Sequence, residues 1–298
     1  AFANSFSLLG KPKQAIPLYE KSNKIFEKIG NKRDVAMGLG NLAYMAQLQI
    51  GKLDAAESNL RRSIEICREI IDDEFIDEVE TVSHQKLGWV LAIQGKFEES
   101  ENELTISTKF WREQNRIERI CIDEKIRSLT ALFMSDAKEA IEHARKTREL
   151  ANIKKYERDI IQAEYLLGAS HLMKGNLPES EKHLEESSIR DRKINLIEFE
   201  PNILLELAKL RLKQNRKPEA LKFAQEGLKI ADRCEYRLKQ ADIHNFLTEF
   251  YLDAGDYTKA REHGEIAKER AGCGYVPALE KAEKLLKDIE MKGISDNS

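Results

Sequence analysis

The chain has 298 residues, of which 41% are hydrophobic and 34% charged, and its formal net charge is −3. This balance excludes the strongly basic character of a nucleic-acid-binding domain, and no apolar run reaches the length of about eighteen residues that a membrane helix needs. Few prolines and glycines interrupt the sequence, as amphipathic helices require. Four scattered cysteines without a C-x-x-C pair, and no signal-peptide pattern, favour a cytoplasmic protein.

The first residues have the pattern of a helix that has already begun. Residues 1–9 resemble the second half of a helix that runs into a turn at Gly10, and the chain does not start with Met. We therefore expect the sequence to be part of a longer protein.

A short turn motif recurs along the whole chain. The motif begins with Gly, followed by one polar residue and then by one apolar or aromatic residue. Two polar residues and an Ala or Ser complete it, as in Gly51–Ala56 and Gly95–Ser100. Its seven copies start at residues 10, 51, 95, 135, 175, 215 and 255, so that the spacings are 41, 44, 40, 40, 40 and 40. A fixed period of this size is typical of a solenoid. Each repeat is predicted to have one helix before the turn (helix A) and one after it (helix B).

The residues of the motif have separate structural roles. Gly at the turn start is expected to end helix A in a left-handed conformation. The fourth repeat has Ser135 and Asp136 instead, either of which can cap helix B. Five residues after each turn start, a small side chain is expected to let helix B approach helix A closely. These small residues are Ala15, Ala56, Ser100, Ala140, Ser180, Ala220 and Ala260.

Two segments depart from the regular pattern. The acidic stretch at residues 71–77 lengthens one spacing to 44, and it predicts either a longer helix B or a protruding loop. After the seventh repeat, residues 271–277 break the helix. A terminal capping helix is expected at about residues 278–291, followed by a frayed tail at 292–298. The solenoid is therefore predicted to span residues 1–291, and in its third repeat helix A covers about 78–94 and helix B about 97–113.

The repeats resemble the tetratricopeptide (TPR) family. In the third repeat the residues that match its pattern are Leu87, Gly88, Leu91, Phe97 and Ser100. The resemblance implies an all-α, right-handed solenoid of about seven helix-turn-helix repeats that acts by protein–protein binding. A period of forty residues also overlaps HEAT and armadillo units, but the Leu-Gly pair favours TPR. In the second repeat Gly40-Asn41-Leu42-Ala43 stands one place early, which predicts a helix A longer by one residue.

A narrower resemblance concerns the protein class. Residues 41–51, 59–70 and 236–247 are similar to C-terminal TPR arrays of bacterial signalling proteins, in which a STAND-type (NACHT or NB-ARC) NTPase precedes the repeats. This resemblance implies a ligand-sensing or autoinhibitory arm in defence or transcriptional regulation. The sequence has no Walker A pattern, so an NTPase domain is expected upstream.

No group of residues has the spacing of a catalytic or metal site. The six histidines do not form an H-E-x-x-H motif; they are His84, His143, His171, His183, His244 and His263. His171 and His183 flank one turn and could meet across a hairpin, but we interpret them as packing or surface residues. An open groove also does not readily supply the closed pocket in which carboxylates become acid–base catalysts. We predict no catalytic residue, no metal ligand and no cofactor.

The A helices of a TPR array normally line its concave face, and this predicts a binding groove. The groove positions lie ten, six, three and two residues before each turn. The candidate partner-binding residues at these positions are Gln85, Trp89, Ile93, Lys125, Leu129, Phe133, Tyr165, Leu172, Met173, Lys209, Lys213, Asn245, Glu249 and Asp253. Trp89 is expected either to anchor a partner or to pack against the next A helix, whereas Trp111 is expected to pack. The expected partner is a protein or peptide, or an upstream NTPase domain, rather than nucleic acid or membrane.

Overall fold

The regular structure is helical throughout the described residues. The computed structural model describes residues 2–71, 73 and 75–295. The A helices are α1 (Phe2–Leu8), α3 (Lys32–Leu42), α5 (Ile76–Ile93), α7 (Ile117–Phe133), α9 (Glu157–Met173), α11 (Glu200–Lys213) and α13 (Arg237–Asp253). The B helices are α2 (Pro12–Lys28), α4 (Leu53–Arg68), α6 (Phe97–Glu113), α8 (Ala137–Lys154), α10 (Leu177–Ile194), α12 (Lys217–Arg233) and α14 (Tyr257–Ala271). The π-helix η1 (Ala43–Gln47) continues α3, and α15 (Val276–Ser295) ends the array. Within these ranges, no helix combines the length and apolarity needed to cross a membrane.

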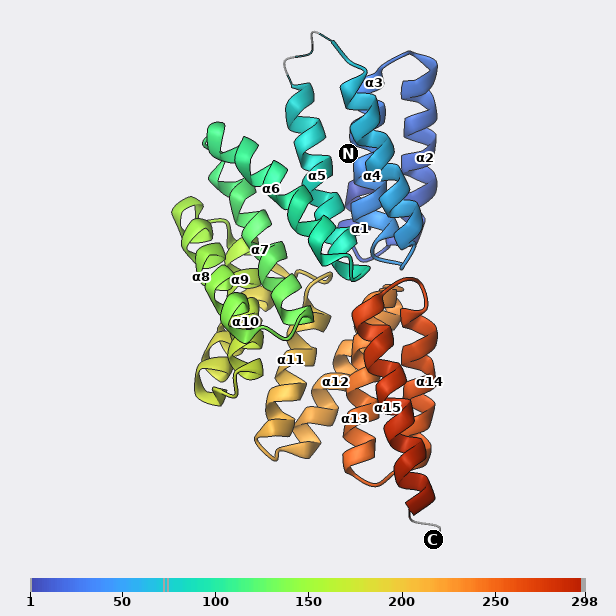
Figure 1. The fold of residues 1–298 in the computed structure, drawn as a ribbon, viewed down its shortest axis with the longest axis vertical. Coiled ribbons are helices and arrows are strands. Elements are labelled where there is room, and N and C mark those ends of the chain that lie inside the picture. The colour runs from blue at the N-terminus through green and yellow to red at the C-terminus, as the bar shows by residue number, and fades with distance from the viewer. Residues whose placement is uncertain (1, 72, 74, 296–298) are drawn as a thin grey trace.

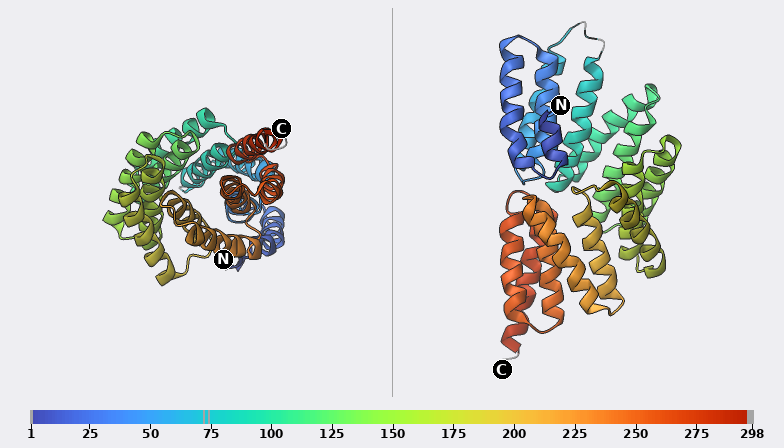
Figure 2. Two further views of the ribbon diagram at one scale, coloured as in Figure 1. Left: turned by 90° about the horizontal axis from the view of Figure 1, so that it is seen from below. Right: turned by 180° about the vertical axis from the view of Figure 1, so that it is seen from behind.

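Consecutive helices stack into a curved solenoid. In Figure 1, α1–α5 lie at one end of the molecule, α12–α15 at the other, and α6–α11 connect them along one side. The end-on view in Figure 2 shows the first and last helices on the same side of the molecule, opposite the middle repeats. The all-α solenoid predicted from the period of the turns is confirmed.

The turns have the backbone geometry that the motif predicts. All seven turn starts have a positive φ, including Ser135 (60°) and Asn215 (62°), which replace glycine. The Asp136 carboxylate accepts hydrogen bonds from the N–H groups of Lys138 and Glu139 and so caps α8. A second series of positive φ angles, between helix B and the next helix A, escaped the sequence analysis. It consists of Gly30, Asn115, Lys155, Asn195, Glu235 and Gly274. Four of these six residues are not glycine, so the sequence did not indicate a positive φ at their positions.

The small residue after each turn lies between the two helices of its repeat. All seven of these side chains are at most 1% exposed. The Ser100 hydroxyl donates a hydrogen bond of 2.7 Å to the Gly88 carbonyl on the facing helix. A Cβ atom on Gly88 would lie 3.0 Å from the Leu104 side chain, so this glycine also permits the close approach. The Leu-Gly pair of the TPR pattern therefore marks the contact between helices A and B.

The extra residue predicted in the second repeat is accommodated by η1. There the Leu48 N–H donates to the Ala43 carbonyl at 2.9 Å, five residues back instead of four. A π-helical turn holds one more residue than an α-helical turn without ending the helix. The segment from Gly30 to Gly51 is accordingly one residue longer than that from Asn115 to Ser135. The helix itself is not longer, since α3 with 11 residues and η1 with 5 have 16 together, whereas α7 has 17.

Two predicted boundaries change. Helix α4 ends at Arg68 and α5 starts at Ile76, so the described residues of the acidic insertion form a loop and not a longer helix B. Asp72 and Glu74 lie outside the described residues. The capping helix α15 starts at Val276, two residues earlier than expected, and continues to Ser295 through part of the predicted tail. Residues 296–298 of that tail lie outside the described residues.

The second repeat contacts the seventh, which closes one turn of the superhelix. The backbone N–H of Arg237 donates to the Gln49 carbonyl at 3.1 Å. The Arg237 guanidinium in turn donates to the carbonyls of Glu269 and Arg270 at 2.8 and 2.9 Å. Arg237 therefore connects the second repeat to the C-terminal end of α14.

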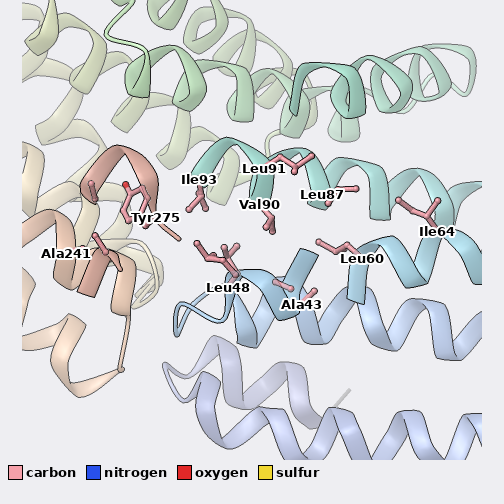
Figure 3. Close-up of a cluster of buried hydrophobic side chains, with 14 residues drawn as sticks. Ala43, Leu48, Leu60, Ile64, Leu87, Val90, Leu91, Ile93, Ala241 and Tyr275 are labelled. Atoms are coloured by element: carbon pink, nitrogen blue, oxygen red, sulfur yellow. The ribbon is translucent and has the colours of Figure 1, made fainter. Parts of the chain in front are cut away.

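A shared apolar cluster accompanies this contact. Leu48 of the second repeat and Ile93 of the third belong to the same buried cluster as Ala241, Tyr275 and Ala278. Figure 3 shows Ala241 and Tyr275 approaching the helices of the second and third repeats. The rings of Phe133 and Tyr275 meet edge-on, with centroids 5.9 Å apart. Burial of apolar surface is the main stabilising contribution in such a contact, so the closure has a core of its own.

Substitution of Ala260 by Leu should disturb the stack locally. Ala260 is fully buried beside Leu252, Leu285 and Leu286. Added methylenes in a packed core cost about 1–3 kcal/mol. We expect hydrogen exchange to increase first in α13–α15, while repeats two to four remain protected. Uniform deprotection of the whole chain would contradict this expectation.

Substitution of Gly51 by Ala should separate the second and seventh repeats and so open the superhelix. Gly51 has φ +75°, and a Cβ there would lie 2.6 Å from Arg237 Cδ and 3.0 Å from Cys273 Sγ. Gly255 has the same φ, but a Cβ there would lie more than 4 Å from every described atom beyond its chain neighbours. Gly255→Ala is therefore a matched control that carries only the backbone strain, which costs roughly 1–2 kcal/mol. The radius of gyration from small-angle X-ray scattering should increase for Gly51→Ala only. Equal dimensions for both variants would show that the contact does not hold the turn closed.

Candidate functional site

An aromatic cavity lies on the concave side of the superhelix, where its two ends meet. Its volume is about 160 Å³. Six aromatic side chains from six different repeats or connections line it: Tyr44, Trp89, Phe133, Tyr165, Phe199 and Tyr275. Tyr165 and Phe199 meet edge-on with centroids 5.0 Å apart. Every lining residue belongs to an A helix, to η1 or to a connection, so the A helices face inward.

A wider groove continues from this cavity toward the C-terminus. Its volume is about 820 Å³, and its walls come from α7, α9, α11, α13 and α15. Leu129, Phe133, Tyr165 and Tyr275 line both spaces, so the cavity and the groove are continuous. The groove carries charges of both signs, with lysines on α11 and α15 and carboxylates on α13.

Two polar groups of the cavity, Asp242 and Lys239, are partly buried and have shifted pKa values. Burial raises the pKa of Asp242 to about 6, against the opposing effects of Lys209 and of the Tyr275 hydroxyl, which donates to Asp242 at 3.1 Å. Burial lowers the pKa of Lys239 to about 8; its ammonium lies 4.2 Å from the centre of the Tyr236 ring. The Lys125 ammonium donates to Gln162 Oε1 at 2.5 Å. The cavity therefore has apolar walls and a few fixed polar groups, as ligand pockets commonly do.

Comparisons with known proteins identify the fold. No family model matches the sequence, and no curated protein matches it either. Among solved structures, the Rap conjugation gene regulator of plasmid pLS20, in complex with the Phr* peptide, has a TM-score of 0.64 at 13% identity, over 89% of this chain and 77% of that one. A Rap protein complexed with competence and sporulation factor has a TM-score of 0.61 at 14% identity, over 86% of this chain and 76% of that one.

A third similar structure is a STAND protein with a tetratricopeptide repeat sensor from Pyrococcus horikoshii. Its TM-score is 0.52 at 14% identity, and the match covers 95% of this chain but only 45% of that one. These neighbours are TPR-like repeat proteins. The chain folds as a TPR-type array. At these identities the similarity establishes the fold alone.

Thirteen of the fourteen predicted groove residues of the TPR array line the cavity or the groove. Those in the cavity are Trp89, Ile93, Lys125, Leu129, Phe133 and Tyr165. The groove adds Leu172, Met173, Lys209, Lys213, Asn245, Glu249 and Asp253. Their role in binding stays a prediction. Trp111, by contrast, is fully buried and packs against Phe110, as expected.

Gln85 is the exception, and its predicted place in the groove is wrong. It is only 3% exposed. Its side-chain amide donates to the Arg119 carbonyl at 2.9 Å and to Asp123 Oδ1 at 2.7 Å. Gln85 therefore satisfies buried polar groups between α5 and α7 and does not face the concave space.

Two C-terminal members of the predicted set are already engaged by the capping helix. The Asn245 amide donates to the Ala278 carbonyl at 2.9 Å, and Asn245 is 1% exposed. Glu249 pairs with Lys281 at 3.0 Å. Sequence reasoning placed α15 after the groove, whereas its residues form part of the groove wall and bond to α13.

The sequence analysis missed a row of lining residues in the fifth, sixth and seventh repeats. Gln162, Asn202 and Asp242 each lie thirteen residues before a turn start and line the cavity. They precede the predicted row by three residues, and positions three apart share one face of a helix. The helical period could therefore have extended the predicted groove by one turn. Leu48 and Gln49 lie three and two residues before Gly51, so the groove rule applies to them although the candidate set omits them. Tyr44 had no such signal, because it reaches the cavity through closure of the superhelix.

Paired histidines and carboxylates join helices A and B in three repeats. In each pair one residue lies eleven before the turn start and its partner eight after it. The pairs are His84 with Glu103, Glu124 with His143, and Glu164 with His183, all through histidine Nδ1. The seventh repeat instead has His244 and His263, whose Nδ1 atoms lie 2.9 Å apart. Sequence reasoning considered only His171 and His183 together and compared no histidine with a carboxylate, so it missed this nineteen-residue pairing.

The histidine pair of the seventh repeat should make this repeat sensitive to acid. Burial, with a smaller contribution from His263, lowers the pKa of His244 to about 4, against about 6.5 in the unfolded chain. The unfolded state therefore binds more protons between these values, and stability falls as the pH drops from about 6.5 to 4, by at most about 1.4 kcal/mol per pH unit. His244→Leu, which copies Leu204 of the sixth repeat, should remove this contribution. Urea unfolding at several pH values measures it, and parallel pH profiles for both proteins would contradict the assignment.

Proposed function

We propose that the array is a non-catalytic scaffold that binds a peptide or protein partner on its concave side. One apolar side chain of the partner enters the aromatic cavity, and the adjoining segment lies along the groove. The observation that supports this proposal most directly is the cavity itself. It has partly exposed aromatic walls, such as Trp89 and Phe133, at a site where several repeats converge.

The size of the cavity suits one side chain. An apolar cavity of about 150 Å³ in another protein accepts a benzene molecule, and this cavity has a volume of about 160 Å³. Buried aromatic residues at the centre of an interface commonly contribute much of its binding free energy. An aromatic or large aliphatic side chain is therefore the anchor that we expect a partner to supply.

The groove suits the polar part of an extended segment. Lys213 and Asp253 are exposed within it and have opposite charge. Lys209 is paired with Glu206 at 2.6 Å, so fewer charges are free than the sequence alone suggests. Charges at the edge of an interface select among partners more than they add affinity. Two of the similar structures are Rap proteins, one in complex with the Phr* peptide and the other with competence and sporulation factor, and the peptide complex favours a peptide over a folded partner.

The second candidate is a ligand-sensing or autoinhibitory arm of a STAND-type NTPase. The observation that favours it is the similarity of nearly the whole chain to a STAND protein with a TPR sensor. In this case the concave site takes the ligand, and the array contacts its own NTPase domain. The gene sequence upstream distinguishes the candidates: a Walker A motif there supports the sensor, and its absence leaves a free-standing scaffold.

The cavity can be tested with peptides selected from a displayed library of random twelve-residue sequences. We expect the selected peptides to share one large apolar residue. Trp89→Ala and Phe133→Ala should each weaken their binding at least tenfold, about 1.4 kcal/mol, because they remove walls of the anchor pocket. Fluorescence anisotropy with labelled peptides measures the change.

Met134→Ala is the matched control for Phe133→Ala. Met134 is the next residue in the chain, is 58% exposed and lies outside both spaces. The Met134→Ala variant should bind the selected peptides with the same affinity as the unmodified chain. If both cavity variants keep full helicity by circular dichroism and full affinity, the central cavity is not the binding site.

A further inference from the structure

We propose that His171, Glu179 and His183 form a binding site for one divalent transition-metal ion of the zinc type, at the turn between α9 and α10. His171 lies near the end of α9, while Glu179 and His183 lie one turn apart on α10. One donor atom from each of the three side chains lies within 4.8 Å of the other two. Two imidazoles and a carboxylate are a common set of ligands for Zn²⁺.

The hydrogen bond that His183 Nδ1 makes with Glu164 leaves Nε2 available to bind a cation. Its Nδ1 lies 2.6 Å from Glu164 Oε2, so this nitrogen carries the proton and donates it to the carboxylate. Its Nε2 then presents a lone pair 3.7 Å from Glu179 Oε2. A lone pair and a carboxylate oxygen repel each other unless a proton or a cation lies between them. A carboxylate on the far ring nitrogen is also the arrangement that orients histidine ligands of metals.

His171 provides the second imidazole and an unsatisfied buried atom. It is 8% exposed, and its Nδ1 has no hydrogen-bond partner. Its ring stacks on that of His183, with the centroids 5.7 Å apart. Two such rings cannot both carry a proton without repulsion. The stacking therefore favours a neutral imidazole, which is the form that binds metals.

The site needs only small movements to close around an ion. Zn–N and Zn–O bonds of about 2.0–2.2 Å place tetrahedral ligand atoms roughly 3.4 Å apart. Rotation of the Glu179 side chain, which is 44% exposed, and of the two rings can supply the approach. Glu179 must leave Lys182, whose ammonium lies 3.5 Å away on the exposed surface. An exposed pair of this kind contributes little to stability, so it opposes the movement only weakly.

The fourth repeat is an internal control built into the chain. There His143 has the same two carboxylate neighbours, Glu124 at 2.6 Å and Glu139 at 3.6 Å. At the position of His171, however, it has Ala131. The fourth repeat thus has the histidine and both carboxylates without the second imidazole, and it shows that alanine fits this position in the fold.

Titration of the full chain with ZnCl₂ by isothermal calorimetry, after treatment with a chelator, tests the site. We expect one ion per chain. His171→Ala, which gives the fifth repeat the composition of the fourth, should abolish stoichiometric binding while circular dichroism stays unchanged. Glu164→Gln should weaken binding by about 10–100-fold, the usual effect of losing the carboxylate behind a histidine ligand.

His143→Ala is the matched control in the fourth repeat, and it should leave the affinity unchanged. Co²⁺ gives an independent readout, because a tetrahedral site produces visible absorption bands that disappear in His171→Ala. Failure of the chain to bind one equivalent of Zn²⁺ would overturn the proposal. So would binding that survives in His171→Ala, or that His143→Ala reduces as much as His171→Ala does. None of these outcomes depends on peptide binding in the cavity.

Discussion

The close approach of helices A and B within each repeat is the contact on which the rest of the structure depends. The small side chain five residues after each turn is almost fully buried between the two helices. Gly168 shows how little space remains, since a Cβ there would lie 2.5 Å from Leu184. The A helices of these hairpins line the concave side of the stack. The stack is curved, and its curvature brings the second and seventh repeats together.

Closure turns an open groove into a cavity. In an open solenoid each repeat contacts only its neighbours. Here Tyr44 and Tyr275, which are far apart in the sequence, line one space. Enclosure also explains the ionisation of Asp242 and Lys239, since burial is the main cause of both pKa shifts. The polar chemistry of the cavity is therefore a consequence of a long-range contact and not of any single repeat.

The features that could be predicted from the sequence are those that recur within one repeat. Turn geometry, the small residue and even the additional residue in η1 follow from periodic positions and local backbone preferences. Long-range contacts leave no such pattern, so Tyr44 and Tyr275 could not be assigned to the cavity. Gln85 was misplaced because its position on the helix faces Asp123, a buried carboxylate of the next repeat. The position of a residue on its helix predicts the side of the helix on which its side chain lies. Whether that side chain can contact a ligand depends on its partners on the neighbouring helix.

Closure of the superhelix also couples ligand binding in the cavity to the conformation of the whole array. A ligand seated in the aromatic cavity contacts side chains of the second repeat and of the connection into α15 simultaneously. In an open form these two walls separate, and the ligand loses contacts with one of them. A ligand shifts a conformational equilibrium by its difference in affinity between the two forms. Any molecule that fills this cavity must therefore favour the closed turn. The same reasoning works in reverse. Arg237 does not line the cavity, so a change at Arg237 that loosens its contact with Gln49 would weaken binding of such a ligand without touching it.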